Sequence, residues 1–171
     1  MALINLSAGD GSWPALRAAW RAQCVAAGED PDLYAQGTFL VLDPLAAAQE
    51  RRSGVYAVRR DDGQIDVICQ VNTTPLPGHP EPVLRVRMVT VSPEIDFGVH
   101  EKSRYIDALA DLFLGIVELS HDPEMGAQEF KLHLRSPEDF NFFRVASRSL
   151  AAVPKFKTVS VHGAWLHVTR A

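Results

Sequence analysis

The alternation of apolar and polar residues predicts a mixed succession of strands and helices along the chain. Segments in which every second residue is apolar favour strands, and apolar residues three or four apart favour helices. The predicted strands span residues 3–6, 55–58, 65–71, 83–91, 130–134, 155–162 and 165–169. The predicted helices span residues 12–27, 45–52, 104–120 and 137–150. Residues 30–42 stay open, because Phe39–Leu42 is too short to distinguish a strand from a buried helix.

The clearest local signal is a β-hairpin in the first half of the chain. Two strand-like runs, 55–58 and 65–71, flank the turn sequence Asp61-Asp62-Gly63. An Asp-Gly pair favours the tight turns that join antiparallel strands. In the next strand, 83–91, we expect Leu84, Val86 and Met88 to face one way and the arginines between them to face the other.

Capping residues predict where the helices begin and end. Ser12 is expected to cap the first helix, with Gly28 as its stop. Asp43-Pro44 predicts the start of a second helix, which Ser53-Gly54 would end. Ser103 is expected to cap the helix that follows. Its predicted buried stripe consists of Ile106, Leu109, Leu112, Phe113, Ile116 and Val117.

Length and charge limit the classes of function. A chain of 171 residues fits a single domain, 1–171, with a core of its own. The formal net charge of −4 argues against a nucleic-acid partner that needs a broad basic surface. The start of the chain lacks the pattern of a signal peptide, and no apolar run is long enough for a membrane span. We therefore expect a cytoplasmic protein, with Cys24 and Cys69 as buried thiols.

The predicted order is one strand, two helices, three antiparallel strands, a helix, a strand, a helix and a closing strand pair. This order resembles the GNAT superfamily of N-acetyltransferases along nearly the whole chain. Val89-Thr-Val-Ser-Pro93 is similar to the family's central strand and its V-x-P entry into the acyl-CoA loop. Leu132-His-Leu-Arg-Ser-Pro-Glu-Asp139 is similar to its next strand and S-P-E-N turn. The implied fold is of the α/β (α+β) class, with a mixed, mostly antiparallel central sheet flanked by helices.

The resemblance implies an acyl-CoA site, although the expected phosphate loop departs from the family. The family's loop reads Q/R-x-x-G-x-G/A, and its glycines let backbone N–H groups approach the pyrophosphate. An alignment without gaps places Asp96, Val99 and Glu101 where the family has Gln or Arg and its two glycines. A small insertion would instead bring Gly98 into use. The phosphate ligands would then be Lys102, Ser103 and Arg104. In the plainer interpretation, Lys102 and Arg104 are exposed residues of the first helical turn.

The resemblance also implies where the thioester and the proton-transfer groups would lie. The pantetheine arm would pair with the central strand and place the thioester near Val89 and Val91. The tyrosine that often protonates the leaving thiolate is missing, because its position holds Ala146 in one alignment and Phe142 or Phe143 in a shifted one. The candidate bases are Glu94 and His133. Each also has a plainer interpretation, as a surface carboxylate and as a polar residue of a half-exposed sheet face.

Two functions follow from these residues. The first is an N-acyltransferase of the GNAT type, which transfers an acyl group from acetyl-CoA or another acyl-CoA to an amine. The amine would belong to a small molecule or a peptide, and a homodimer is compatible with this function. The departures in the loop and at Ala146 mark a degenerate member of the superfamily. The alternative is therefore a catalytically inactive protein of the same fold that binds a ligand or a partner.

Overall fold

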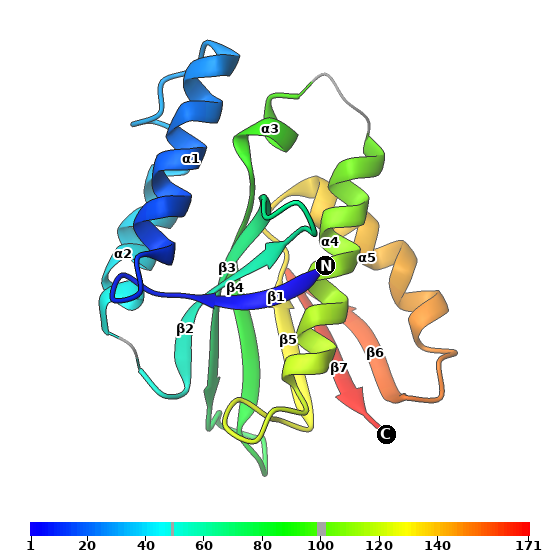
Figure 1. Ribbon diagram of the computed structural model, residues 1–171. Helices are drawn as coiled ribbons and strands as arrows, with labels where there is room; N and C mark the ends of the chain where they lie inside the picture. Colours follow the sequence, from blue (N-terminus) through cyan, green and yellow to red (C-terminus); the bar gives the residue numbers. More distant parts are fainter. Residues whose placement is uncertain (49, 99–101) are drawn as a thin grey trace.

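The order of helices and strands follows the prediction closely (Figure 1). The computed structural model describes residues 1–48, 50–98 and 102–171. Its elements are β1 (Ala2–Leu6), α1 (Ser12–Ala27), α2 (Gln36–Ala48), β2 (Ser53–Arg59), β3 (Ile65–Thr74), β4 (Val83–Val91), α3 (Pro93–Asp96), α4 (Lys102–Leu119), β5 (Glu129–His133), α5 (Pro137–Leu150), β6 (Phe156–His162) and β7 (Trp165–Arg170). No helix among these residues is both long and apolar enough to cross a membrane.

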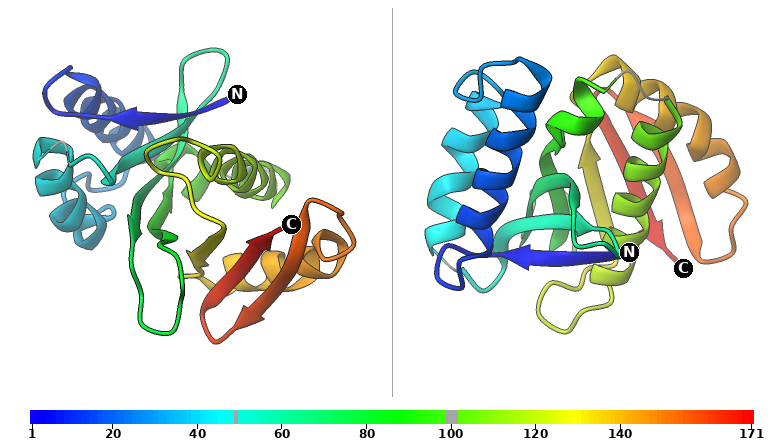
Figure 2. Two further views of the ribbon diagram at one scale, coloured as in Figure 1. Left: turned by 90° about the horizontal axis from the view of Figure 1, so that it is seen from below. Right: turned by 45° about the horizontal axis from the view of Figure 1, so that its top comes forward.

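The strands form a 7-stranded sheet in the order β1-β2-β3-β4-β5-β7-β6. Every neighbouring pair is antiparallel except β4 and β5, which run parallel in the middle of the sheet. Helices lie on both faces of this sheet, as Figure 2 shows from two directions. The predicted class, a mixed and mostly antiparallel sheet flanked by helices, is therefore confirmed.

Each face of the sheet carries a separate apolar core. On one face, α4 and α5 pack on the central and closing strands, with Phe113 of α4 in ring contact with Phe130 and Phe143. On the other face, α1 and α2 pack on β2 and β3 around Trp13, Trp20 and Phe39. Cys24 and Cys69 are buried free thiols, as predicted.

The second helix differs from the prediction in position. Helix α2 begins at Gln36 and contains Pro44, so the predicted start at Asp43-Pro44 is wrong. Packing explains the difference, because Phe39 and Leu42 bury their side chains against β2 and β3 and outweigh the proline. Ser53 and Gly54, the predicted stop, belong to β2.

Smaller corrections concern helix starts and the faces of two elements. Gly11 is the N-cap of α1, and Ser12 is its first residue. Helix α4 begins at Lys102, so Ser103 lies inside its first turn and does not cap it. Ile106 is 42% exposed and does not belong to the buried stripe of α4. Met88 packs with the α1 and α2 core, whereas Leu84 and Val86 face the opposite core.

Candidate functional site

The candidate site lies where the two parallel strands separate. Strands β4 and β5 are paired from Val83 opposite Glu129 to Val86 opposite Leu132, and the pairing stops there. Strand β4 continues to Val91 with pairing to β3 alone. The two strands therefore diverge and leave a wedge at the upper end of the sheet (Figure 1). Within the described ranges, one edge of β4 at the wedge has no neighbouring strand.

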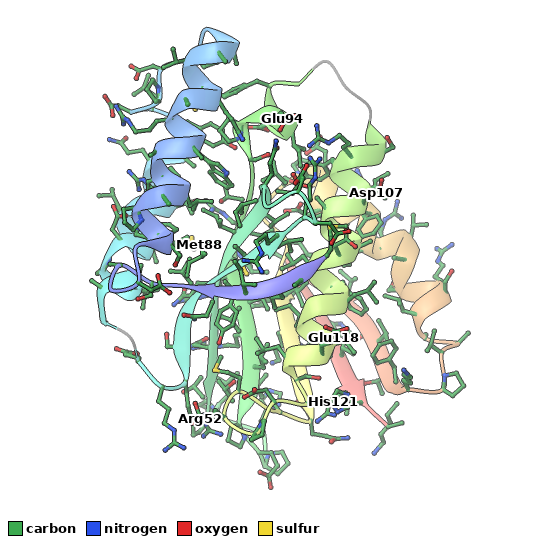
Figure 3. The ribbon with its side chains drawn as sticks, viewed as in Figure 1. Arg52, Met88, Glu94, Asp107, Glu118 and His121 are labelled. Atoms are coloured by element: carbon green, nitrogen blue, oxygen red, sulfur yellow. The ribbon has the colours of Figure 1, made fainter. Side chains whose placement is uncertain are left out.

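A β-bulge in β4 accompanies this divergence. Ile68 of β3 lies opposite Thr90, but Gln70 lies opposite Arg87, so β4 carries an extra residue between these pairs. Met88, at this point, has a φ of 54°, which a non-glycine residue rarely adopts. Bulges bend a strand and sharpen its twist. The bulge thus explains why β4 turns away from β5, and why Met88 points toward α1 and α2 (Figure 3).

A cleft of about 510 Å³ opens at the wedge. Segments that are far apart in sequence contribute to its walls: β4, the connection from α1 to α2, α3, the first turn of α4 and the start of α5. The lining residues are Glu29, Asp30, Leu33, Tyr34, Ala35, Thr38, Val89, Thr90, Val91, Asp96, Phe97, Tyr105, Arg135, Ser136 and Asp139. This volume is within the usual range for small-molecule sites.

Hydrogen bonds join the α1 and α2 side of the cleft to β4. The Tyr34 hydroxyl donates to the backbone carbonyl of Val91 at 2.7 Å. The hydroxyls of Thr38 and Thr90 are 3.0 Å apart, and Nη1 of Arg135 donates to Thr38 at 2.9 Å. Burial raises the pKa of Tyr34. Its phenol therefore stays protonated and can keep donating to the strand at neutral pH.

Asp139 organises the opposite wall of the cleft. Its carboxylate accepts the backbone N–H groups of Arg135 and Ser136, both at 3.1 Å, and the Tyr105 hydroxyl at 2.6 Å. The Ser136 hydroxyl accepts the N–H of Asp139 at 2.9 Å and completes a capping box at the start of α5. Burial, and then the bond to Asp139, raise the pKa of Tyr105. Tyr105 is thus a fixed hydrogen-bond donor in the cleft.

The predicted cofactor residues divide between the cleft and its surroundings. Val89 and Val91 line the cleft. Gly98 is exposed, and Ser103 lies in the first turn of α4. Val99, Glu101 and the side chain of Lys102 are outside the described part of the structure. Asp96 lines the cleft, and partial burial raises the pKa of its carboxyl.

Arg104 and Glu94 lie together beside the cleft, in a separate surface hollow. Nη1 of Arg104 is 3.0 Å from the Glu94 carboxylate, and Nη2 is 3.5 Å from that of Asp66. Asp107 of α4 also lines this hollow, and Figure 3 labels it together with Glu94. Arg104, which was predicted to bind phosphate, is therefore already paired with two carboxylates. Glu94, predicted as a base, does not line the cleft.

His133 lies on the sheet face away from α4 and α5, and its ring centroid is 4.7 Å from that of Trp165. The structure therefore brings Val89, Val91 and Asp96 together but separates them from Glu94 and His133. Sequence reasoning missed Tyr34, Thr38 and Tyr105 as lining residues. The first two belong to the segment left open, and nothing in the local pattern places Tyr105 next to Ser136. In the sequence, the turn Ser136-Pro-Glu-Asp139 was the one feature that pointed to this wall of the cleft.

Comparisons with known proteins add little to this geometry. Neither a protein-family model nor a curated protein matches the sequence. Among solved structures, an acetyltransferase candidate from Exiguobacterium sp. 255-15 is 15% identical over 99% of this chain and 92% of its own, with a TM-score of 0.42. A point mutant of the BH1408 protein from Bacillus halodurans is 12% identical over 95% and 99%, with a TM-score of 0.38. At these TM-scores, neither structure supports a function for this chain.

Proposed function

We propose that the protein is an acyl-CoA-dependent N-acyltransferase that acts on an amine. The observation that supports the proposal is the wedge between β4 and β5. Its free strand edge borders a cleft of about 510 Å³, which suits an extended arm entering between the strands. A pantetheine arm carries amides that can pair with a free strand edge in the way a peptide does. Acetyl-CoA or another acyl-CoA is therefore the proposed co-substrate.

In the proposed reaction, the thioester lies beside Val89, which has no partner in the register of β3. The amine nitrogen forms a bond to the carbonyl carbon, and the carbon–sulfur bond breaks with its electron pair left on sulfur. The proton that the nitrogen loses passes to that sulfur, so the products are an amide and the CoA thiol. Backbone N–H groups of β4 would stabilise the oxyanion, and the cleft would hold the two substrates in line. The chain thus contributes mainly position and hydrogen bonds.

Tyr105 borders the cleft but does not act as the acid. Its one hydroxyl proton is donated to the Asp139 carboxylate at 2.6 Å, so none is left for the leaving sulfur. Tyr105 therefore positions Asp139 and does not replace the tyrosine missing at Ala146. The two predicted bases, Glu94 and His133, both stay predictions. Glu94 is paired with Arg104, and His133 lies on the sheet face away from α4 and α5.

Calorimetric titration with acetyl-CoA tests the proposal. We expect a Kd between about 1 and 100 µM for the wild type, a range typical of a specific small-molecule site. Val89→Trp fills the wedge and should abolish binding, whereas Val25→Trp, at a position on α1 that is 66% exposed, should leave the Kd unchanged. Lys102→Ala should weaken binding if Lys102 contacts phosphate. Thermal unfolding of each variant verifies that it is folded.

The second candidate is a catalytically inactive protein that binds a ligand or partner through the same cleft. The observation that favours it is the pair of carboxylates, Glu94 and Asp66, that occupies Arg104. Carboxylates near a pyrophosphate oppose its binding by about 1 kcal/mol or more each at close range. Absence of any heat at millimolar acetyl-CoA would exclude the transferase and leave this candidate.

A further inference from the structure

The second half of the sheet has a polar face, and no helix among the described residues packs on it. Helices α1 and α2 cover only the first part of the sheet on this side, where they pack on residues such as Val55, Ala57 and Ile68. On the neighbouring strands, the same face carries Gln70, Asn72, Arg85, Arg87, Glu129, Lys131, His133 and His167. The residues that alternate with them, such as Leu84, Val86 and Leu132, are buried in the core under α4 and α5. We call this surface the open face.

The side chains of the open face form rows across the strands. Asn72 lies opposite Arg85, Arg85 opposite Lys131, and Lys131 opposite His167. Opposed residues on paired strands are about 5 Å apart, and Arg87 follows Arg85 at about 7 Å along β4. Arg85, Arg87 and Lys131 thus place the Cα atoms of three cationic residues within about 10 Å of one another, on a protein whose net charge is −4.

The two arginines have no anionic partner in the described part of the structure. No carboxylate there lies within 4.0 Å of either guanidinium. Their Nε atoms are buried and make no hydrogen bond, and the same holds for Oε1 of Gln70 and Oδ1 of Asn72. A buried donor without a partner costs free energy, most of all on a charged group. Burial, and then the charge of Arg87, lower the pKa of Arg85.

Lys131 faces the same surface, and the carboxylate nearest to it is already occupied. Its Nζ is 3.0 Å from Nε2 of His79, and Nδ1 of His79 is 2.6 Å from Glu129. Since an ammonium can only donate, His79 accepts at Nε2 and donates to Glu129 at Nδ1. Glu129 is therefore bound to the histidine, keeps its own charge, and lies within 4.0 Å of neither guanidinium. With three cations and one carboxylate, the open face keeps an excess of positive charge.

We propose that the open face binds a small molecule with at least two anionic groups, carboxylates or phosphates, through Arg85, Arg87 and Lys131. The two guanidinium forks suit planar or tetrahedral oxyanions, which they bind in pairs of hydrogen bonds. Three cations confined to this patch suit a compact ligand, since the acidic remainder of the protein repels a long polyanion. On the basis of the proposed function, the ligand is the amine acceptor: Val89 lies two residues beyond Arg87, so the anionic end is about 7 Å from the wedge.

Binding of simple anions tests this inference without acyl-CoA, so it can fail or succeed independently of the proposed function. Citrate and inorganic pyrophosphate serve as probes of the two chemistries, titrated calorimetrically at low salt. We expect a Kd below about 1 mM for at least one probe and about a tenfold or greater weakening in Arg85→Gln/Arg87→Gln. The stronger probe identifies the group, carboxylate or phosphate. Arg144→Gln/Arg148→Gln removes the same charge from exposed positions of α5 and should change the Kd less than twofold.

Measurements on the wild type protect the test against a variant that fails to fold. The Nε–H signals of Arg85 and Arg87 in a ¹H–¹⁵N spectrum should shift on addition of the probe that binds. The inference is overturned if neither probe binds at about 20 mM, if both double variants weaken binding equally, or if these signals stay in place. It is also overturned if sedimentation shows a dimer that Arg85→Gln/Arg87→Gln dissociates, since the open face would then be an interface between two copies.

Discussion

Asp139 is the residue whose removal should affect the cleft most directly. Its buried carboxylate accepts two backbone N–H groups and the Tyr105 hydroxyl. Asp139→Asn removes the charge and one accepting oxygen, so we expect a loss of about 2 to 3 kcal/mol in the free energy of unfolding. Urea denaturation measures this loss. The control Glu138→Gln, an exposed carboxylate in the same turn, should lose less than about 1 kcal/mol; equal losses would contradict the role given to Asp139.

Asp96 should make stability depend on pH in a defined direction. Partial burial raises the pKa of its carboxyl above that of the unfolded chain, so the native state holds the proton more tightly. The contribution of this tighter proton binding to the free energy of unfolding is complete below about pH 3.8. It is lost as the pH rises through the pKa of Asp96 in the folded protein. Asp96→Asn should therefore unfold at a higher temperature than the wild type at pH 7.

The same comparison near pH 4 provides the check on this sign. There the carboxyl is increasingly protonated in both states, so the gap in unfolding temperature between Asp96→Asn and the wild type should narrow. Glu118→Gln on the exposed side of α4 controls for the loss of one negative charge. A gap that widens toward pH 4 would mean that the carboxylate is stabilised, and not penalised, in the folded protein.

Among the elements, α4 depends on Phe113 for its packing on the sheet. The ring contacts Phe130 of β5 at 5.9 Å, Phe143 of α5 at 6.2 Å and Phe156 of β6 at 5.9 Å between centroids. Phe113→Ala leaves a cavity between these elements and should cost about 3 to 5 kcal/mol of unfolding free energy. The neighbouring Leu114 is 59% exposed, so Leu114→Ala should cost less than about 0.5 kcal/mol. A similar cost for both would contradict this packing.

The elements also indicate what the sequence could predict. Strands β2 to β5 and the closing hairpin follow from alternation and turn residues, because each is a local pattern. Helix α2 and the direction of Met88 did not follow, since the first depends on burial of Phe39 against β2 and β3 and the second on a bulge in β4. A bulge shifts the alternation by one residue, and nothing in 83–91 marks its position.

At the scale of the whole molecule, the candidate site depends on contacts between distant segments. Thr38 bonds Arg135 across 97 residues, and Tyr105 bonds Asp139 across 34. No pattern within one element predicts such pairs, whereas Val89 and Val91 could be placed from the strand that contains them. The unbalanced charge of the open face was equally hidden, since it arises only when β4 and β5 bring Arg85 next to Lys131.

The central claim is that an acyl-CoA arm enters the wedge between β4 and β5. Titration of ¹⁵N-labelled protein with CoA, followed residue by residue in ¹H–¹⁵N spectra, tests it most directly. The account predicts that the backbone amide signals of Val89, Thr90 and Val91 shift together with that of Ser136 across the cleft, while that of Val25 on α1 stays in place. Unchanged signals at all four cleft positions, at a CoA concentration that saturates any binding, would contradict it.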